Sequence, residues 1–110
     1  MKKIIAVDFD GTLVTDDYPY IGRPIWKTIN FCKTAQENGD ILILWTCRCG
    51  NDLKEAIEFC ESIGLYFDYV NENTKEHLEL FGGQDTRKIY ADIYIDDKSI
   101  NFNKFKINRY

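Results

Sequence analysis

Two short acidic motifs contain the residues of this sequence whose types and spacing are best suited to chemistry. Asp8-Phe9-Asp10-Gly11-Thr12 follows an apolar run near the start of the chain, and Asp96-Asp97 follows another near its end. Gly11 permits a bend that turns both acids of the first motif toward one pocket. A rigid carboxylate beside a second acid that exchanges a proton is the arrangement for covalent phosphoryl transfer. The motif therefore predicts a nucleophile, Asp8, and a general acid and base, Asp10.

The acids of the two motifs also predict a bound cation. The set consists of Asp8, Asp10, Asp96 and Asp97. Bringing these carboxylates to one edge of a fold costs free energy through like-charge repulsion and partial desolvation. A hard divalent ion with oxygen ligands, most simply Mg²⁺, offsets that cost. The alternative is a group of unrelated, solvated acids, which is common for one such motif but not for two together.

These acids must be positioned by the elements that precede them. Unbroken apolar runs predict buried strands over Lys3–Val7, Asp40–Trp45, Tyr66–Val70 and Tyr90–Ile95. The segments between them predict helices from Pro24 to Gly39, from an N-cap at Asn51 to Gly64, and from a capping box at Asn73 and Glu76 to Gly82-Gly83. Strands and helices therefore alternate along the whole pattern.

This alternation predicts an α/β fold, a three-layer α/β/α sandwich with a parallel, Rossmann-like sheet, in a single domain over residues 1–110. The carboxyl ends of all parallel strands share one edge, where ligands bind. That edge is expected to gather both acidic motifs, Thr46 after the second strand, and the segment Asn71–Lys75 after the third.

An amine is expected at the same edge, to neutralise phosphoryl oxygens. Lys75 follows the third predicted strand and so lies on the active edge, whereas Lys88 precedes the fourth strand. Six strand residues span about 20 Å, more than a lysine side chain reaches. Lys75 is therefore the predicted catalytic amine.

Asp8-Phe9-Asp10-Gly11-Thr12-Leu13 resembles the first motif of the haloacid dehalogenase (HAD) superfamily, whose members are mostly phosphatases. Thr46 after its apolar strand resembles the second motif, and Ile93–Asp97 resembles the acidic fourth motif. The resemblance spans Lys3–Asp97, with gaps too short for a cap domain, as in small capless members.

The resemblance implies a Mg²⁺-dependent phosphatase that works through an aspartyl-phosphate on Asp8. Asp8, the backbone carbonyl of Asp10 and Asp96 would bind the metal, with Asp97 helping directly or through water. Thr46 would hydrogen-bond the phosphoryl group.

Further residues near the first two motifs are candidates for contact with the substrate. Gly11, Thr12 and Arg48 are candidate substrate-binding residues, although a solvated Arg48 is an equal alternative. Tyr18–Ile21 either forms a stacking flap for a ring of the substrate or packs against the first predicted helix.

Two other classes of function compete with a phosphatase. A phospho-acceptor receiver domain has a similar size, fold and set of acids, but its acceptor aspartate follows the third strand, where this chain has Asn71. A catalytically idle phosphate-binding module is disfavoured because each catalytic position holds a competent residue.

Composition limits the location and the partners. The net charge is −4 and no apolar run has transmembrane length, so we expect a cytoplasmic protein with reduced cysteines, no membrane contact and no strong nucleic-acid binding. The expected partner is a phosphorylated small molecule, nucleotide or macromolecule. Lys98, Lys104, Lys106 and Arg109 form an acid-free basic tail, either a solvated face or a phosphate-binding one.

Overall fold

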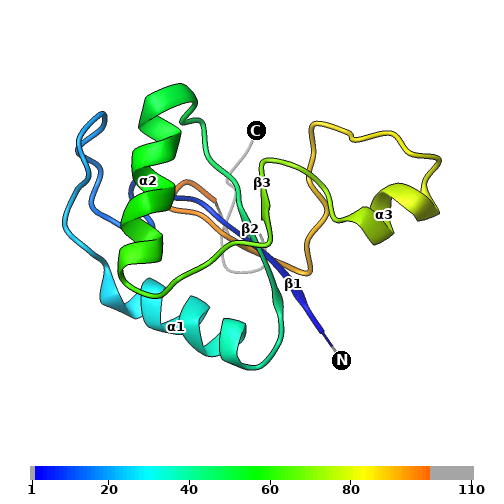
Figure 1. Cartoon of the computed structure of the whole chain (residues 1–110), viewed down its shortest axis with the longest axis horizontal. Helices are drawn as coiled ribbons and strands as arrows, with labels where there is room; N and C mark the ends of the chain where they lie inside the picture. The colour runs from blue at the N-terminus through cyan, green and yellow to red at the C-terminus, as the bar shows by residue number, and fades with distance from the viewer. Residues whose placement is uncertain (1, 100–110) are drawn as a thin grey trace, which may run out of the picture.

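Four short parallel strands form the sheet in this computed structural model, which describes residues 2–99 of the chain. The strands are β1 (Ile4–Val7), β2 (Ile41–Leu44), β3 (Tyr69–Val70) and β4 (Ile93–Ile95). They lie in the order β3-β2-β1-β4, and every neighbouring pair is parallel. The first strand of the chain therefore lies inside the sheet, between β2 and β4 (Figure 1).

Helices α1 (Trp26–Glu37) and α2 (Gly50–Ser62) cover one face of the sheet. Ile29, Cys32 and Cys60 from these helices are buried among alternate strand residues such as Val7 and Leu44. Alternate residues of a strand point to the same face, so β1 and β2 each contribute two side chains to this core. This layer is the larger of the two hydrophobic clusters.

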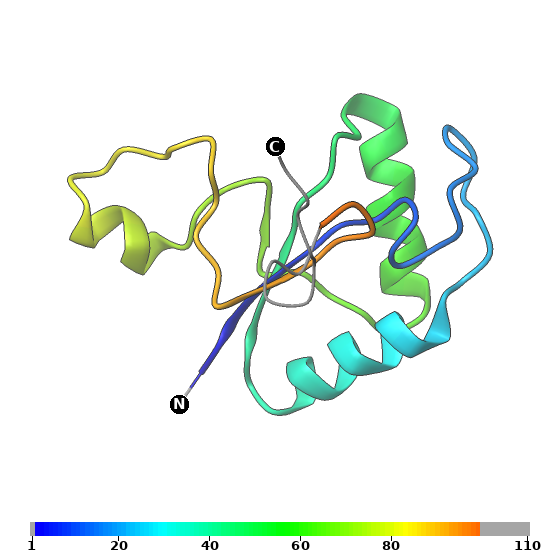
Figure 2. The ribbon, with the colours of Figure 1, turned by 180° about the vertical axis from the view of Figure 1, so that it is seen from behind.

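The opposite face of the sheet is covered more thinly. Ala6 and Ile43 pack there against Ile89 and Ala91, which precede β4. Helix α3 (Lys75–Leu80) stands to the side of the body formed by the sheet, α1 and α2, as both ribbon views show (Figures 1 and 2). The predicted α/β class with a parallel, Rossmann-like sheet is confirmed. No helix within residues 2–99 is long and apolar enough to cross a membrane.

Several predicted boundaries are wrong by a few residues. Helix α2 begins at Gly50, so Asn51 lies inside it and Cys49 is the N-cap. Thr74 caps α3, because its hydroxyl accepts a hydrogen bond from the His77 backbone amide, and Asn73 is not the cap. The third and fourth strands are shorter than predicted.

Side-chain oxygens accept hydrogen bonds from backbone amides near the starts of β3 and β4. The Leu42 amide donates to the Asp68 carboxylate, and the Ile4 amide donates to the Asp92 carboxylate. The Ala91 amide donates to the Tyr94 hydroxyl. Because side-chain oxygens satisfy these donors, the regular pairing of β3 and β4 begins only after these positions.

Asn73 ties the segment before β4 to the end of β3. Its side chain is 1% exposed; its amide nitrogen donates to Asp85, and its oxygen accepts a hydrogen bond from the Tyr90 backbone amide at 2.7 Å. A buried polar group with both ends satisfied fixes the path of the chain around it.

We expect Asn73→Ala to lower the free energy of unfolding by about 1–3 kcal/mol, because it leaves the Tyr90 amide without its acceptor. Urea unfolding measures the change. The matched control is Asn30→Ala on the exposed side of α1, which should change stability by less than about 0.5 kcal/mol. Equal stabilities for the two variants would contradict a structural role for Asn73.

Candidate metal and phosphate site

The register of the sheet places the carboxyl end of β1 beside the carboxyl ends of β2 and β4. Val7 pairs with Leu44 of β2 and with Ile95 of β4. The ladder continues one residue further, since the Asp8 amide donates to the Ile95 carbonyl at 3.0 Å. Backbone pairing therefore holds Asp8 beside the end of β4, where Asp96 follows.

Three carboxylates meet at this edge. One oxygen each from Asp8, Asp96 and Asp97 lies within 4.8 Å of the others. A Cβ built on Gly11, which has a φ of +83°, would collide with the Asp97 side chain, so the absence of a side chain at Gly11 admits Asp97 to the group. Three convergent carboxylates offer the oxygen ligands that suit Mg²⁺. The residues present fit a hard divalent cation.

The pKa values of Asp8 and Asp97 are shifted in opposite directions. Burial raises the pKa of half-buried Asp8 from 3.8 to about 6, and the charges of Asp96 and Asp97 add to the effect. Burial also pushes up the pKa of Asp97, but hydrogen bonds with Lys98 and Asp96 outweigh it and leave that pKa below its usual value. Neighbouring acids with divergent pKa values are typical of functional sites.

A cavity of about 330 Å³ opens beside the three acids. Its lining residues are Asp8, Trp45, Thr46, Cys47, Asp96 and Lys98. Thr46 is fixed there because its amide donates to the Asn71 side chain at 2.8 Å. Its hydroxyl accepts a hydrogen bond from the Arg48 amide at 3.1 Å.

The amine at this cavity is Lys98, which sequence reasoning assigned only to the basic tail. Its Nζ lies 3.2 Å from Asp97 Oδ2, and its amide donates to Asp96. Lys75 begins α3 and is not among the residues that line the cavity. The signal available in the sequence was the position of Lys98 directly after the second acidic motif. Lys104, Lys106 and Arg109 lie outside the described residues.

Asp10 turns away from the three acids and pairs with Arg48. The guanidinium Nε lies 2.8 Å from Asp10 Oδ2, and Nη2 lies 2.8 Å from Asp10 Oδ1. Arg48 is 2% exposed, and all five of its side-chain N–H groups have protein acceptors. Arg48 is therefore buried rather than solvated, and in this structure none of its side-chain donors is left over for a phosphate.

The structure also places the other predicted contact residues. Thr12 is 5% exposed, and its hydroxyl has no hydrogen-bond partner within the described residues. The Tyr18–Ile21 loop contacts α2, since the Tyr18 hydroxyl donates to Asp52 at 3.0 Å. Tyr18 and Tyr20 are exposed, and their role as a stacking flap stays a prediction.

Comparison with known proteins gives one informative match. No known family model and no curated protein match the chain. Among solved structures, it is similar to a conserved protein from Bacteroides thetaiotaomicron, with 41% identity over 91% of this chain and 79% of that chain, at a TM-score of 0.78. The chain belongs to the family of this conserved Bacteroides protein. The match establishes family and fold and names no activity.

The four cysteines of this family member are free thiols. Cys32 and Cys60 are buried in the core, and burial raises the pKa of both. Cys47 and Cys49 are exposed. Among residues 2–99, the only group of three or more acids, histidines or cysteines placed to hold a metal is the Asp8, Asp96 and Asp97 cluster.

The raised pKa of Asp8 predicts a pH-dependent stability. The folded state holds this proton more tightly than the unfolded state, so stability contributed by Asp8 is full below 3.8 and is lost as the pH rises through about 6. At neutral pH without metal, Asp8→Asn should therefore unfold at a higher urea concentration than the wild type. We expect about 1 kcal/mol, because solvent screens a half-buried group.

Addition of Mg²⁺ should reverse this ranking. Saturation at about 100 times the dissociation constant stabilises the wild type by about 2.7 kcal/mol. Asp8→Asn should gain much less, whereas Asp40→Asn, at the opposite end of β2, should respond as the wild type does. A wild-type melting temperature that is equal with Mg²⁺ and with chelator would contradict the metal site.

Proposed function

We propose that this protein is a Mg²⁺-dependent phosphatase of the haloacid dehalogenase type. The observation that carries the proposal is the convergence of Asp8, Asp96 and Asp97 beside an open cavity that Thr46 and Lys98 also line. A phosphate monoester offers the anionic oxygens that a metal ion, a hydroxyl and an ammonium group would bind together. The motif resemblance adds an independent argument for the same chemistry.

Asp8 acts as the nucleophile in this proposal. Its carboxylate oxygen forms a bond to phosphorus while the bond from phosphorus to the leaving oxygen breaks. Asp10 takes up a proton from solvent as it releases one of its bonds to Arg48, and it passes this proton to the leaving oxygen. Water then attacks the aspartyl-phosphate, Asp10 accepts a proton from that water, and inorganic phosphate and the free Asp8 carboxylate are released. Thr46 and Lys98 hold the phosphoryl oxygens throughout.

The metal would be held by Asp8, Asp96 and Asp97. When bound, Mg²⁺ neutralises phosphoryl charge and keeps the Asp8 carboxylate ionised. The chain itself fixes the ligands, because Asp8 is held by the sheet ladder and Asp97 packs against Gly11.

The surroundings of Asn71 favour a phosphatase over a receiver domain. A receiver carries its phosphorylated aspartate after the third strand, and the Asn71 side chain there accepts a hydrogen bond from the Thr46 amide. An amide committed to backbone support is not a phosphate acceptor.

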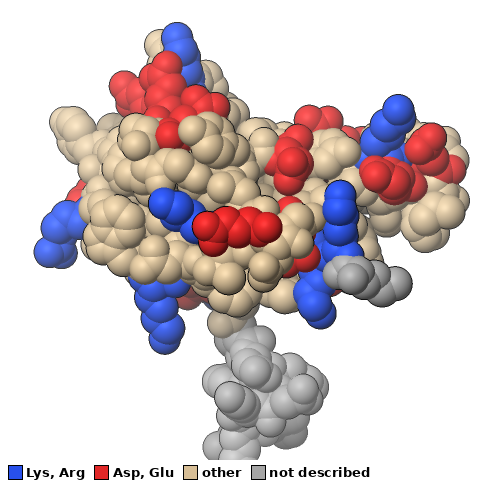
Figure 3. Space-filling model, turned by 60° about the horizontal axis from the view of Figure 1, so that its bottom comes forward, with Lys and Arg blue, Asp and Glu red and all other residues tan. Residues whose placement is uncertain are grey.

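The substrate class remains broad in this proposal. The cavity is open at the surface. From the composition we infer that the protein works in the cytoplasm. The face in Figure 3 carries acidic and basic side chains in scattered positions without a broad basic patch, which agrees with weak affinity for nucleic-acid backbones.

Removal of the nucleophile is the primary test. Asp8→Asn should abolish phosphate release from an aryl phosphate, because an amide cannot form the aspartyl-phosphate, while its circular dichroism stays that of the wild type. Asp40→Asn, the same substitution at the opposite end of a strand, should retain activity. Wild-type turnover by folded Asp8→Asn would overturn the mechanism, and absence of turnover in the wild type on aryl, sugar and nucleotide phosphates would overturn the function.

A series of lysine substitutions tests the amine. Because Lys98 lines the cavity and Lys75 does not, Lys98→Met should lower phosphate release by about tenfold or more, and Lys75→Met by less. Lys88→Met should resemble the wild type, since Lys88 lies four residues before Asp92, which pairs with the start of β1. A larger loss at Lys75 would support the original sequence-based assignment.

A further inference from the structure

The Arg48 guanidinium binds three segments of the chain at once. Beyond the paired bonds to Asp10, Nη2 donates to the Tyr20 carbonyl at 2.9 Å. Nη1 donates to the carbonyls of Pro19 at 3.1 Å and Asp52 at 3.3 Å. The first acidic motif, the loop before α1 and the first turn of α2 therefore share one cation.

Aromatic rings enclose this cation on two sides. The guanidinium carbon lies 5.0 Å from the ring centroids of Phe9 and of Tyr18. The Tyr18 hydroxyl bonds to Asp52, which closes the loop onto α2. A cation so enclosed keeps its bonds rigid, because water does not compete for the donors.

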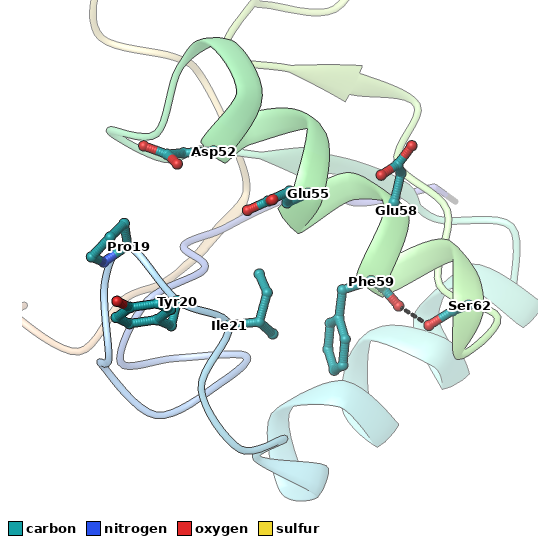
Figure 4. A pocket seen from close by; sticks show the side chains of 8 residues that line it. All are labelled: Pro19, Tyr20, Ile21, Asp52, Glu55, Glu58, Phe59 and Ser62. Carbon is teal, nitrogen blue, oxygen red and sulfur yellow. Dashed lines mark hydrogen bonds between the residues drawn. The ribbon is translucent and has the colours of Figure 1, made fainter.

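The loop and α2 also face each other beyond Arg48. Pro19, Tyr20 and Ile21 lie opposite Asp52, Glu55 and Phe59 across an open groove of about 590 Å³ (Figure 4). The loop and α2 are joined by the carbonyl bonds to Arg48 and by the hydrogen bond from Tyr18 to Asp52. Arg48 alone of these residues also contacts Asp10.

We propose that Arg48 is a positioning residue that couples the 18–21 loop to Asp10, and so sets when Asp10 can serve as the acid and base. Both Asp10 oxygens accept a hydrogen bond from Arg48, and in this proposal Asp10 turns toward a substrate by giving up one of the two bonds. The retained bond keeps the carboxylate anchored as it turns. The loop carbonyls hold the guanidinium in place during that turn. This inference rests on the proposed phosphatase for its catalytic part alone.

Hydrogen exchange tests the coupling without any activity. The Asp10 side chain has no hydrogen bond to the 18–21 loop among those described, and Arg48 is the side chain that contacts both. Backbone bridges also join Asp10 to Val14 and Val14 to Pro24, but Asp10→Asn leaves the backbone groups of these bridges in place. We expect Asp10→Asn and Arg48→Lys each to speed amide exchange of a 16–22 peptide several-fold, measured by mass spectrometry. The double variant should exchange no faster than Arg48→Lys alone.

Two control variants test whether faster exchange in the loop is specific to Asp10 and Arg48. Asp40→Asn repeats the aspartate substitution at a distant strand end, and Lys54→Met removes an exposed cation from the same helix that contributes Asp52. Both should leave exchange in the loop at the wild-type rate. Wild-type exchange in Asp10→Asn, or strictly additive effects in the double variant, would overturn the coupling.

The choice of leaving group tests the catalytic part. An alkyl phosphate needs a proton on its leaving oxygen much more than a nitrophenyl phosphate does. Arg48→Met should therefore lower kcat for the alkyl phosphate by about tenfold more than for the nitrophenyl phosphate, and Arg48→Lys carries the same test if Arg48→Met does not fold. Addition of Asp10→Asn should then cause little further loss.

The possible failures are distinguishable. Equal loss on both substrates would mean that Arg48 is only structural and would overturn the catalytic part. If the wild type releases no phosphate from either substrate, the proposed function fails, and the exchange measurement alone decides whether Arg48 couples the loop to Asp10.

Discussion

The placement of β1 between two parallel neighbours is the constraint on which the rest of this structure depends. Val7 is paired on both sides, and the Asp8 amide extends the ladder to the Ile95 carbonyl. Parallel pairing aligns the carboxyl ends of strands that lie almost ninety residues apart in sequence. The sheet thus holds carboxylates together that would repel one another in a flexible chain, and hydrophobic burial of the strands supplies the free energy that opposes this repulsion.

One buried ring separates the two acids of the first motif. Phe9 has no exposed surface and meets Phe59 of α2 edge to face, with ring centroids 6.4 Å apart. The chain turns directly after it, at Gly11. Asp8 therefore joins the acids after β4, whereas Asp10 joins Arg48. Two identical residue types two positions apart therefore have different surroundings, a cluster of carboxylates at Asp8 and a guanidinium at Asp10.

The sequence was sufficient to predict the order of elements and the meeting of the two acidic motifs, since both follow from apolar runs and from the geometry of parallel sheets. It was not sufficient for Arg48, because its acceptors include carbonyls 28 and 29 residues away, whose direction depends on the path of a loop without periodicity. Lys98 was missed for a related reason. Its proximity to Asp97 depends on the turn after β4, and a local pattern of charge does not specify that turn.

The balance of charge at the cavity links these observations to binding. Among residues 2–99, three carboxylates meet one ammonium group there, that of Lys98, because Arg48 is already paired with Asp10. A phosphate monoester approaching this edge alone would meet net repulsion from the acids, in a chain whose net charge is also negative. A divalent cation inverts the sign of the local field. Under the proposed function, the metal would therefore serve substrate binding as well as the chemical step that follows.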